Sequence, residues 1–262
     1  MPTDKIISRK EGLTGHLVFN NPERHNAVSL EMWDAVEEAL DDFVGDDKVR
    51  VIILSGAGGK AFVSGADISK FESERGSMEA VAHYNARIKA VYGKVNALPK
   101  PTLAMIDGFC LGGGLALAVS CDLRFCSEKS KFGLPAARLG LGYPYEGLRR
   151  LVNAVGPGAA KDIVFSGRRL DAEEALRIGL VQKVLPEQEL ESFVFDYART
   201  VSDNAPLTVT SLKFIVGEIL KDPADRDLRK CQEMVDRCFA SEDYIEGRRA
   251  FTEKRKPQFK GR

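Results

Sequence analysis

Apolar residues along the first half of the chain fall into short strand-like runs separated by helical patterns. The runs IIS, HLVFN, VRVIILSG, PTLAMIDG and DLRFCS follow one another from residue 5 to about residue 126. Between them, apolar positions recur at helical spacing, as in SLEMWDAVEEALDDFV, which begins at Ser29 with a residue suited to an N-cap. This alternation of strands and helices predicts an α/β fold.

Beyond about residue 146 the strand-like runs nearly vanish and helical patterns take over. Another helix is predicted earlier, over residues 78–97, where the sequence LPKP ends it. The later helices are separated by helix-breaking residues, namely Gly156, Pro157, Gly179, Pro186, Pro206 and Pro223. We therefore expect a helical C-terminal third, with a basic tail, EKRKPQFKGR, that is partly frayed.

The chain has 262 residues, enough for one large α/β domain with a sizeable core. Lys and Arg together number 38, as do Asp and Glu, so no overall basic field indicates a nucleic-acid or membrane partner. No apolar run approaches the roughly 20 residues of a membrane span, and the N-terminus has no apolar targeting segment. The five cysteines and three histidines form no metal-ligand pattern, so we expect a cytoplasmic protein without a metal.

Three consecutive glycines, Gly112, Gly113 and Gly114, stand in the stretch GFCLGGGLALAVSCD, where a strand runs into a helix-like sequence. Each glycine costs a helix interior roughly 1 kcal/mol relative to alanine, which indicates that something approaches this backbone closely. Unpaired N–H groups at a helix N-terminus attract negative charge, so an oxyanion or a phosphate would fit there. The spacing excludes a GxGxxG dinucleotide fingerprint, a Walker loop and a GxSxG serine nucleophile.

A second loop of small residues, Ser64, Gly65 and Ala66 in KAFVSGADI, also follows a strand. Two such loops could each direct one N–H group at a single oxygen, which is how an oxyanion hole is built from the main chain. Taken alone, either loop could equally be a tight turn or a close helix contact.

Five segments follow one another over nearly the whole chain: FVSGADI, IDGFCLGGGLALAVSCDLRF, KFGLPAARLGLGY, GLVQKVLP and FTEKRKPQF. This series resembles the crotonase superfamily of enoyl-CoA hydratases and isomerases. The resemblance implies a crotonase-like spiral of ββα units as the core domain over residues 1–200. It also implies a helical C-terminal region over residues 201–262 that assembles a homotrimer or homohexamer.

The resemblance further implies an acyl-CoA thioester as the substrate, so that CoA is part of the substrate and no separate cofactor is needed. The thioester carbonyl oxygen would be held by the N–H groups of Ala66 and Gly113, which would stabilise an enolate. Substrate-binding positions implied in this way are Ser64, Gly65, Asp67, Ile68, Gly112, Ala116, Ala136 and Leu141. Phe251 and Lys254 match positions that meet the adenine and phosphate of CoA, sometimes from a neighbouring subunit.

The chain departs from the family pattern at two positions that carry glutamates in its hydratases. One position lies two residues after the triple glycine and the other directly after the proline of FGLP, and here they are Ala116 and Ala136. Alanine has no titratable group, so the paired acid/base mechanism cannot operate at these positions. The segment that follows, LGLGYPYEGLRRL, offers Glu146 and Tyr143 as replacements.

Both replacements also have simpler interpretations. Glu146 stands where many hydratases have glycine, and a carboxylate is favoured at any helix start by the helix dipole. Tyr143 matches a tyrosine of decarboxylases that act on malonyl-type CoA esters, but those enzymes carry a histidine where this chain has Ala66. A packed ring with one hydrogen bond is the alternative role for Tyr143.

The sequence therefore predicts an acyl-CoA enzyme of the enoyl-CoA hydratase/isomerase type in which Glu146, with Tyr143, replaces the missing glutamates. A decarboxylase of a malonyl-type CoA ester is the second hypothesis, because loss of CO2 itself generates the carbanion and needs no strong base. The third is a noncatalytic acyl-CoA binder that keeps the pocket without the chemistry.

Overall fold

The computed structural model of the protein describes residues 3–67, 70, 73–74 and 76–262. Its strands are β1 (Ile6–Glu11), β2 (Thr14–Phe19), β3 (Val51–Gly56), β4 (Ala61–Val63), β5 (Thr102–Ile106), β6 (Phe109–Leu111), β7 (Leu123–Ser127), β8 (Lys131–Gly133) and β9 (Lys183–Leu185). Its α-helices are α1 (Leu30–Gly45), α3 (Met78–Ala97), α4 (Gly113–Ala118), α5 (Tyr145–Ser166), α6 (Ala172–Arg177), α7 (Glu187–Ser202), α8 (Pro206–Ile219), α9 (Leu228–Phe239) and α10 (Glu242–Glu253). The five strand-like runs and the helix over 78–97 are confirmed as β1, β2, β3, β5, β7 and α3.

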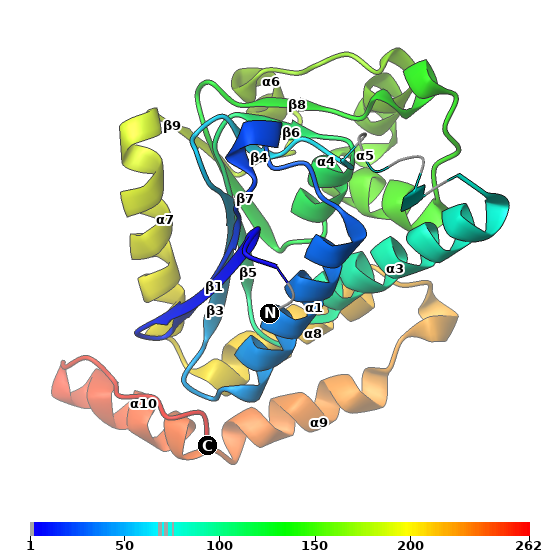
Figure 1. The fold of residues 1–262 in the computed structure, drawn as a ribbon. Coiled ribbons are helices and arrows are strands. Elements are labelled where there is room, and N and C mark those ends of the chain that lie inside the picture. The colour runs from blue at the N-terminus through cyan, green and yellow to red at the C-terminus, as the bar shows by residue number, and fades with distance from the viewer. Residues whose placement is uncertain (1–2, 68–69, 71–72, 75) are drawn as a thin grey trace.

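The strands form two sheets (Figure 1). The larger has the order β1-β2-β3-β5-β7-β9, in which β1 and β2 are antiparallel and the other neighbours are parallel. The smaller has the order β4-β6-β8, with parallel neighbours. Successive pairs β3 and β4, β5 and β6, and β7 and β8 each give one strand to each sheet before the chain enters a helix. This repetition is the expected spiral of ββα units.

The larger sheet is covered on both faces, which explains why its central strands are apolar at successive positions rather than alternate ones. In β3, Ile52 and Leu54 pack into one core with α1, α3 and α4, whereas Val51 and Ile53 pack against α7 on the other face. Figure 1 shows α7 alone on one side of this sheet and α1, α3, α4 and α5 on the other. The smaller sheet lies within the thicker of these two layers.

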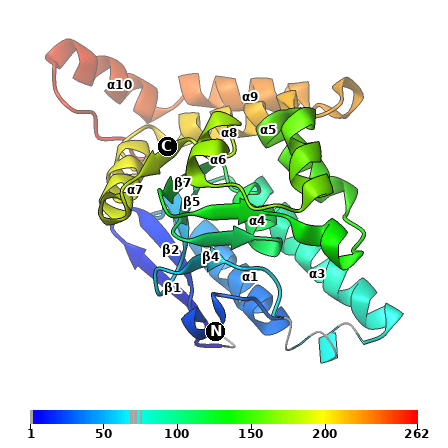
Figure 2. The ribbon, with the colours of Figure 1, turned by 90° about the horizontal axis from the view of Figure 1, so that it is seen from above.

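The C-terminal helices form a layer outside the core (Figures 1 and 2). Helix α8 is fixed to the core by Lys213, whose Nζ donates to the Asp122 carboxylate at 2.7 Å. The expectation of a frayed tail is wrong, because residues 257–262 fold back onto α10. The Asp243 carboxylate accepts from the N–H groups of Lys260 and Gly261, at 2.7 and 2.8 Å.

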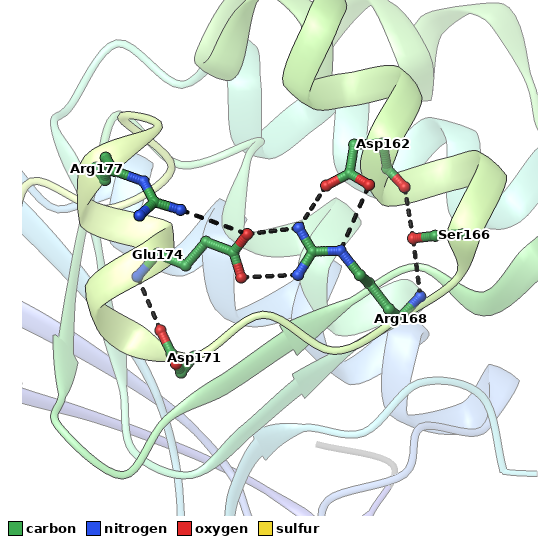
Figure 3. A network of polar contacts seen from close by, with 6 residues as sticks. All are labelled: Asp162, Ser166, Arg168, Asp171, Glu174 and Arg177. Atoms are coloured by element: carbon green, nitrogen blue, oxygen red, sulfur yellow. Dashed lines mark hydrogen bonds and ion pairs between the residues drawn. The ribbon is translucent and has the colours of Figure 1, made fainter.

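An ion-pair network fixes the turn between α5 and α6 (Figure 3). Arg168 lies between Asp162 of α5 and Glu174 of α6, and its Nη1 donates to Glu174 Oε2 at 2.8 Å. The carboxylates of Glu174 and Asp162 raise the pKa of the Arg168 guanidinium further above its usual range. These side chains are partly exposed and pair with one another, so the network has a structural role in orienting α6.

In the part of the chain that the structure describes, no helix combines the length and the apolar composition needed to cross a bilayer.

Candidate functional site

Two loops meet at the carboxyl ends of neighbouring strands in the smaller sheet. The first follows β4 and contains Ser64, Gly65 and Ala66, and the second follows β6 and contains the three glycines. Because β4 and β6 are parallel partners, their carboxyl ends lie at the same edge of the sheet. A methyl group placed on Gly113 would lie 3.8 Å from the Gly65 Cα atom. The two loops therefore lie against each other, as the sequence pattern predicts.

A short parallel bridge between Val28 and Ala66 orients the first loop. The Val28 N–H donates to the Gly65 carbonyl at 2.9 Å, and the Asp67 N–H donates to the Val28 carbonyl at 3.0 Å. Because this bridge uses the groups of Gly65 and Asp67, the N–H of Ala66 points away from Val28. Gly65 has a φ of +116°, a conformation that a residue with a side chain rarely adopts.

Gly112 and Gly114 must be glycines for two different structural reasons. Gly112 has a φ of +52° and donates its N–H to the Gly133 carbonyl at 2.8 Å. A methyl group on Gly114 would lie only 2.0 Å from the Val63 carbonyl oxygen. The group that approaches Gly114 closely is thus the backbone of β4 and not a ligand.

The N–H groups of Ala66 and Gly113 are both available to a ligand. Within the described residues, neither donates a recorded hydrogen bond. Gly113 is the first residue of α4, so its N–H has no intrahelical acceptor. Because α4 has only six residues, its helix dipole is small. The two N–H donors therefore contribute more than the dipole to the binding of an anionic oxygen.

Tyr92 fixes the position of Gly113 from the other side. Its Oη donates to the Gly113 carbonyl at 2.8 Å, and a methyl group on Gly113 would lie 3.0 Å from this oxygen. Tyr92 is almost fully buried on α3, where its ring meets that of Trp33 edge to face. The sequence analysis missed this residue, although a tyrosine on the buried face of a mostly polar helix needs a polar partner for its hydroxyl.

The two alanines at the positions where the resemblance implies glutamates lie against the main core. Ala116, one turn beyond Gly113 on α4, is only 3% exposed. Ala136 lies in the 3₁₀ turn Pro135–Leu139, is partly buried against the same core, and accepts at its carbonyl from the Leu141 N–H at 3.0 Å. Neither position supplies a proton donor or acceptor side chain.

The proposed replacements occupy different environments near the start of α5. The carboxylate of Glu146 pairs with Arg149 one turn along the helix, at 3.0 Å between Nη2 and Oε2, and is more than a third exposed. The ring of Tyr143 packs against Gly147 and the core. Burial raises the pKa of Tyr143 to about 12, so its hydroxyl is protonated at neutral pH.

Arg150 is a further charged group at this place that the sequence analysis missed. Its Nε is buried and has no hydrogen-bond partner among the described residues. Burial lowers the pKa of the Arg150 guanidinium, while Glu146, Tyr143 and Tyr92 each raise it, so all three lie within electrostatic reach. The available signal was its spacing from Glu146, because residues four positions apart share one side of a helix.

Three further positions in and directly after the first loop were predicted to bind the substrate. The Asp67 carboxylate is 7% exposed and lies 3.5 Å from Arg24 Nη1. Ser64 donates from Oγ to the Arg24 carbonyl at 3.5 Å. Ile68 lies outside the described residues.

Phe251 and Lys254 lie far from the two loops within one chain. Phe251 is 88% exposed on α10, and Lys254 follows the end of that helix with a φ of +54°. Figures 1 and 2 both place α10 apart from α4. A role for these residues at the loops therefore requires the corresponding helix of another subunit.

No group of three or more His, Cys, Asp or Glu side chains with the geometry to hold a metal ion occurs among the described residues.

Comparison with known proteins extends over the whole chain. A family profile described as enoyl-CoA hydratase/isomerase matches residues 10–262. The chain is 35% identical to a short-chain-enoyl-CoA hydratase of Clostridium acetobutylicum, over 100% of both chains. It is 36% identical to a crotonyl-CoA hydratase of Syntrophomonas wolfei, over 99% of both. A crystal structure of enoyl-CoA hydratase from Bacillus anthracis superposes with a TM-score of 0.90, at 31% identity, covering 99% of this chain and 100% of that one.

Proposed function

Because this chain belongs to the enoyl-CoA hydratase/isomerase family of the crotonase superfamily, we propose that it binds an acyl-CoA thioester at the two loops and acts on it through an enolate. The observation that carries this proposal is the pair of available N–H groups, of Ala66 and Gly113, on loops that lie against each other. The thioester carbonyl oxygen accepts from both. As negative charge develops on that oxygen, the two hydrogen bonds strengthen, and removal of one such donor typically costs about 3 kcal/mol of transition-state stabilisation.

The proton transfers need groups other than those at Ala116 and Ala136. Glu146, in the first turn of α5, is the candidate base, and release from Arg149 would free it to accept a proton. Tyr143, protonated at neutral pH, would donate a hydrogen bond at the acyl end. In this scheme the backbone supplies the larger share of the stabilisation and Glu146 moves the proton in hydration or isomerisation.

Two further functions are favoured by the loss of both carboxylates. A malonyl-type decarboxylase would use the same enolate, formed when the bond between the α carbon and the carboxylate breaks and CO2 leaves, with the α carbon then taking a proton. A noncatalytic binder would hold the thioester through the N–H groups of Ala66 and Gly113 and would carry out no reaction on it.

A panel of enoyl-, 3-hydroxyacyl- and malonyl-type CoA esters, followed by mass spectrometry, separates these functions. A mass gain or loss of one water indicates hydration or its reverse, and a loss of CO2 indicates decarboxylation. An unchanged mass with a changed chromatographic retention time indicates isomerisation, whereas binding with neither mass nor retention time changed indicates a binder. Gly113→Val, which fills the space between Gly65 and Tyr92, should abolish turnover, whereas Gly158→Val, where no neighbour lies within 4 Å, should retain it. Equal activity in both variants would refute the assignment of the amide pair.

We further propose that the chain assembles as a trimer or a dimer of trimers through its C-terminal helices. These helices expose large apolar side chains that a single chain leaves uncovered, including Leu212, Val216, Ile219, Leu228, Phe239 and Ile245. In such an assembly Phe251 and Lys254 would contact the CoA bound to a neighbouring subunit. Light scattering at micromolar concentration should give a mass well above the 28.8 kDa of one chain, and a monomer would contradict the proposal.

A further inference from the structure

One buried side-chain amide, that of Asn26, joins two segments that lie apart in the sequence. Asn26 is completely buried, and its Oδ1 accepts from the Asn21 N–H at 2.8 Å. Its Nδ2 donates to the carbonyl groups of Ala57 and Ala61, at 2.9 and 2.7 Å, so both N–H groups of the amide are used. Because a buried polar group left unpaired costs free energy, these hydrogen bonds hold residues 21–26 against residues 57–61.

The backbone at Asn26 has a conformation that few residues with a side chain adopt. His25 and Asn26 have φ values of +52° and +55°. Asparagine tolerates this left-handed region better than most residues do. Strained positions of this kind persist only where the surrounding structure holds them, and they gather at functional sites. The hydrogen bonds of the Asn26 amide supply that support.

This strained turn carries the groups that hold the first loop. The Ser64 N–H donates to the His25 carbonyl at 3.2 Å. Val28, two residues after Asn26, forms the bridge that fixes the backbone on both sides of Ala66. The strand that leads into this loop, β4, begins with the residue whose carbonyl accepts the shorter of the two Nδ2 hydrogen bonds. Asn26 therefore holds both the strand before Ala66 and the segment beside it.

We propose that Asn26 is a positioning residue of the oxyanion hole, whose buried amide sets the direction of the Ala66 N–H without touching the substrate. This inference rests on the proposed function, since it requires the thioester carbonyl oxygen to accept from Ala66. A donor held by a rigid framework needs no rearrangement as charge develops on that oxygen. Loss of the Asn26 amide should weaken the hydrogen bond from Ala66 and leave the one from Gly113.

The test measures the polarisation of the bound thioester directly. Butanoyl-CoA labelled with ¹³C at its carbonyl is bound at saturation to the full chain, and difference infrared spectroscopy records the carbonyl stretching frequency. In the wild type, the two donors should lower this frequency below that of the free ester. A merely structural role of Asn26 would not change this shift in a folded variant.

Asn26→Gly is the most informative variant, because glycine adopts a positive φ readily and the change therefore removes the amide without adding backbone strain. It should lose about half of the wild-type frequency shift, since one of two donors is misplaced. On an accepted acyl-CoA ester, kcat should fall by about 10- to 100-fold, as expected for a displacement of about 1 Å, and by a larger factor than the factor by which KM changes.

Two control variants separate positioning from stability. Asn20→Ala removes another side-chain amide, which donates to the Asp4 carbonyl at 3.2 Å, and should keep the full frequency shift. Val194→Ala opens a cavity in the core between α7 and the larger sheet, so it should lower the melting temperature while the frequency shift and kcat stay as in the wild type. All spectra are recorded at a temperature where circular dichroism shows each variant to be folded.

A folded Asn26→Gly variant with the wild-type shift and kcat would overturn the inference, and so would an equal loss of shift in Val194→Ala. If Asn26→Gly does not fold, Asn26→Ser decides in its place, because a single hydroxyl can donate to only one of the two carbonyl groups. A wild-type protein that binds the ester without any frequency shift would refute the proposed amide pair itself. A wild-type shift that persists in Asn26→Gly refutes only the positioning role.

Discussion

Gly114→Ala tests the contact that brings the two loops together. The added methyl group would lie 2.0 Å from the Val63 carbonyl oxygen and 2.8 Å from its carbon, whereas real contacts of this kind stay beyond 3.0 Å. The obstacle is backbone, so it cannot rotate away as a side chain would. Either the start of α4 or the end of β4 must therefore move by about 1 Å.

The expected magnitude follows from two opposing effects. Overpacking of this kind typically costs 1–3 kcal/mol, and the stiffer unfolded chain of an alanine variant returns about 0.4–1 kcal/mol. The difference leaves a net loss of about 1.3 kcal/mol, which lowers the melting temperature by roughly 3–5 °C in a domain of this size. A displacement of about 1 Å between Ala66 and Gly113 should also lower kcat/KM by about 10²-fold.

Thermal unfolding and steady-state kinetics on an accepted acyl-CoA ester measure these two effects. Gly158→Ala is the matched control, because it adds the same methyl group to helix α5 with no atom within 4 Å. It should be as stable as the wild type or slightly more stable, with unchanged activity. A Gly114→Ala variant that melts and turns over like the wild type would refute the close approach of α4 to β4.

Three smaller predictions follow from single side chains. Tyr92→Phe removes the hydrogen bond to the Gly113 carbonyl and should cost about 1 kcal/mol of stability in denaturant unfolding. In steady-state kinetics, kcat should fall by a larger factor than the factor by which KM changes. An unchanged kcat would mean that the hydroxyl does not position Gly113. Glu146→Gln should lower kcat by about 10²- to 10⁴-fold with acyl-CoA affinity nearly intact, and full activity would reduce Glu146 to a solvated residue at a helix start. Burial lowers the pKa of His16 despite the nearby Glu11, so the unfolded chain binds a proton near pH 6.5 that the folded chain takes up only at lower pH. Stability should therefore fall as pH drops below about 6.5, and denaturant titrations of His16→Phe should show a weaker fall; an equal fall in both proteins would assign it to other groups.

The sequence by itself determined the secondary structure of the core and the presence of two loops of small residues, one of them with three glycines. Apolar runs such as VRVIILSG become strands because they bury side chains on both faces, and the polar-apolar pattern over 78–97 becomes one helix with those bounds. These patterns are local, since they depend on the backbone period of each element. The absence of a carboxylate at Ala116 and Ala136 is likewise a property of the sequence alone.

Only the tertiary structure decided which of these parts meet. The order β4-β6-β8 brings the two loops to one edge, and no periodicity within either strand specifies that order. The same holds for Gly114, whose neighbour is a carbonyl of another strand, and for Tyr92, which reaches Gly113 from α3. Side-chain partners between distant elements depend on how whole faces pack, because many weak contacts summed over a face, rather than one local preference, fix the relative positions of the elements.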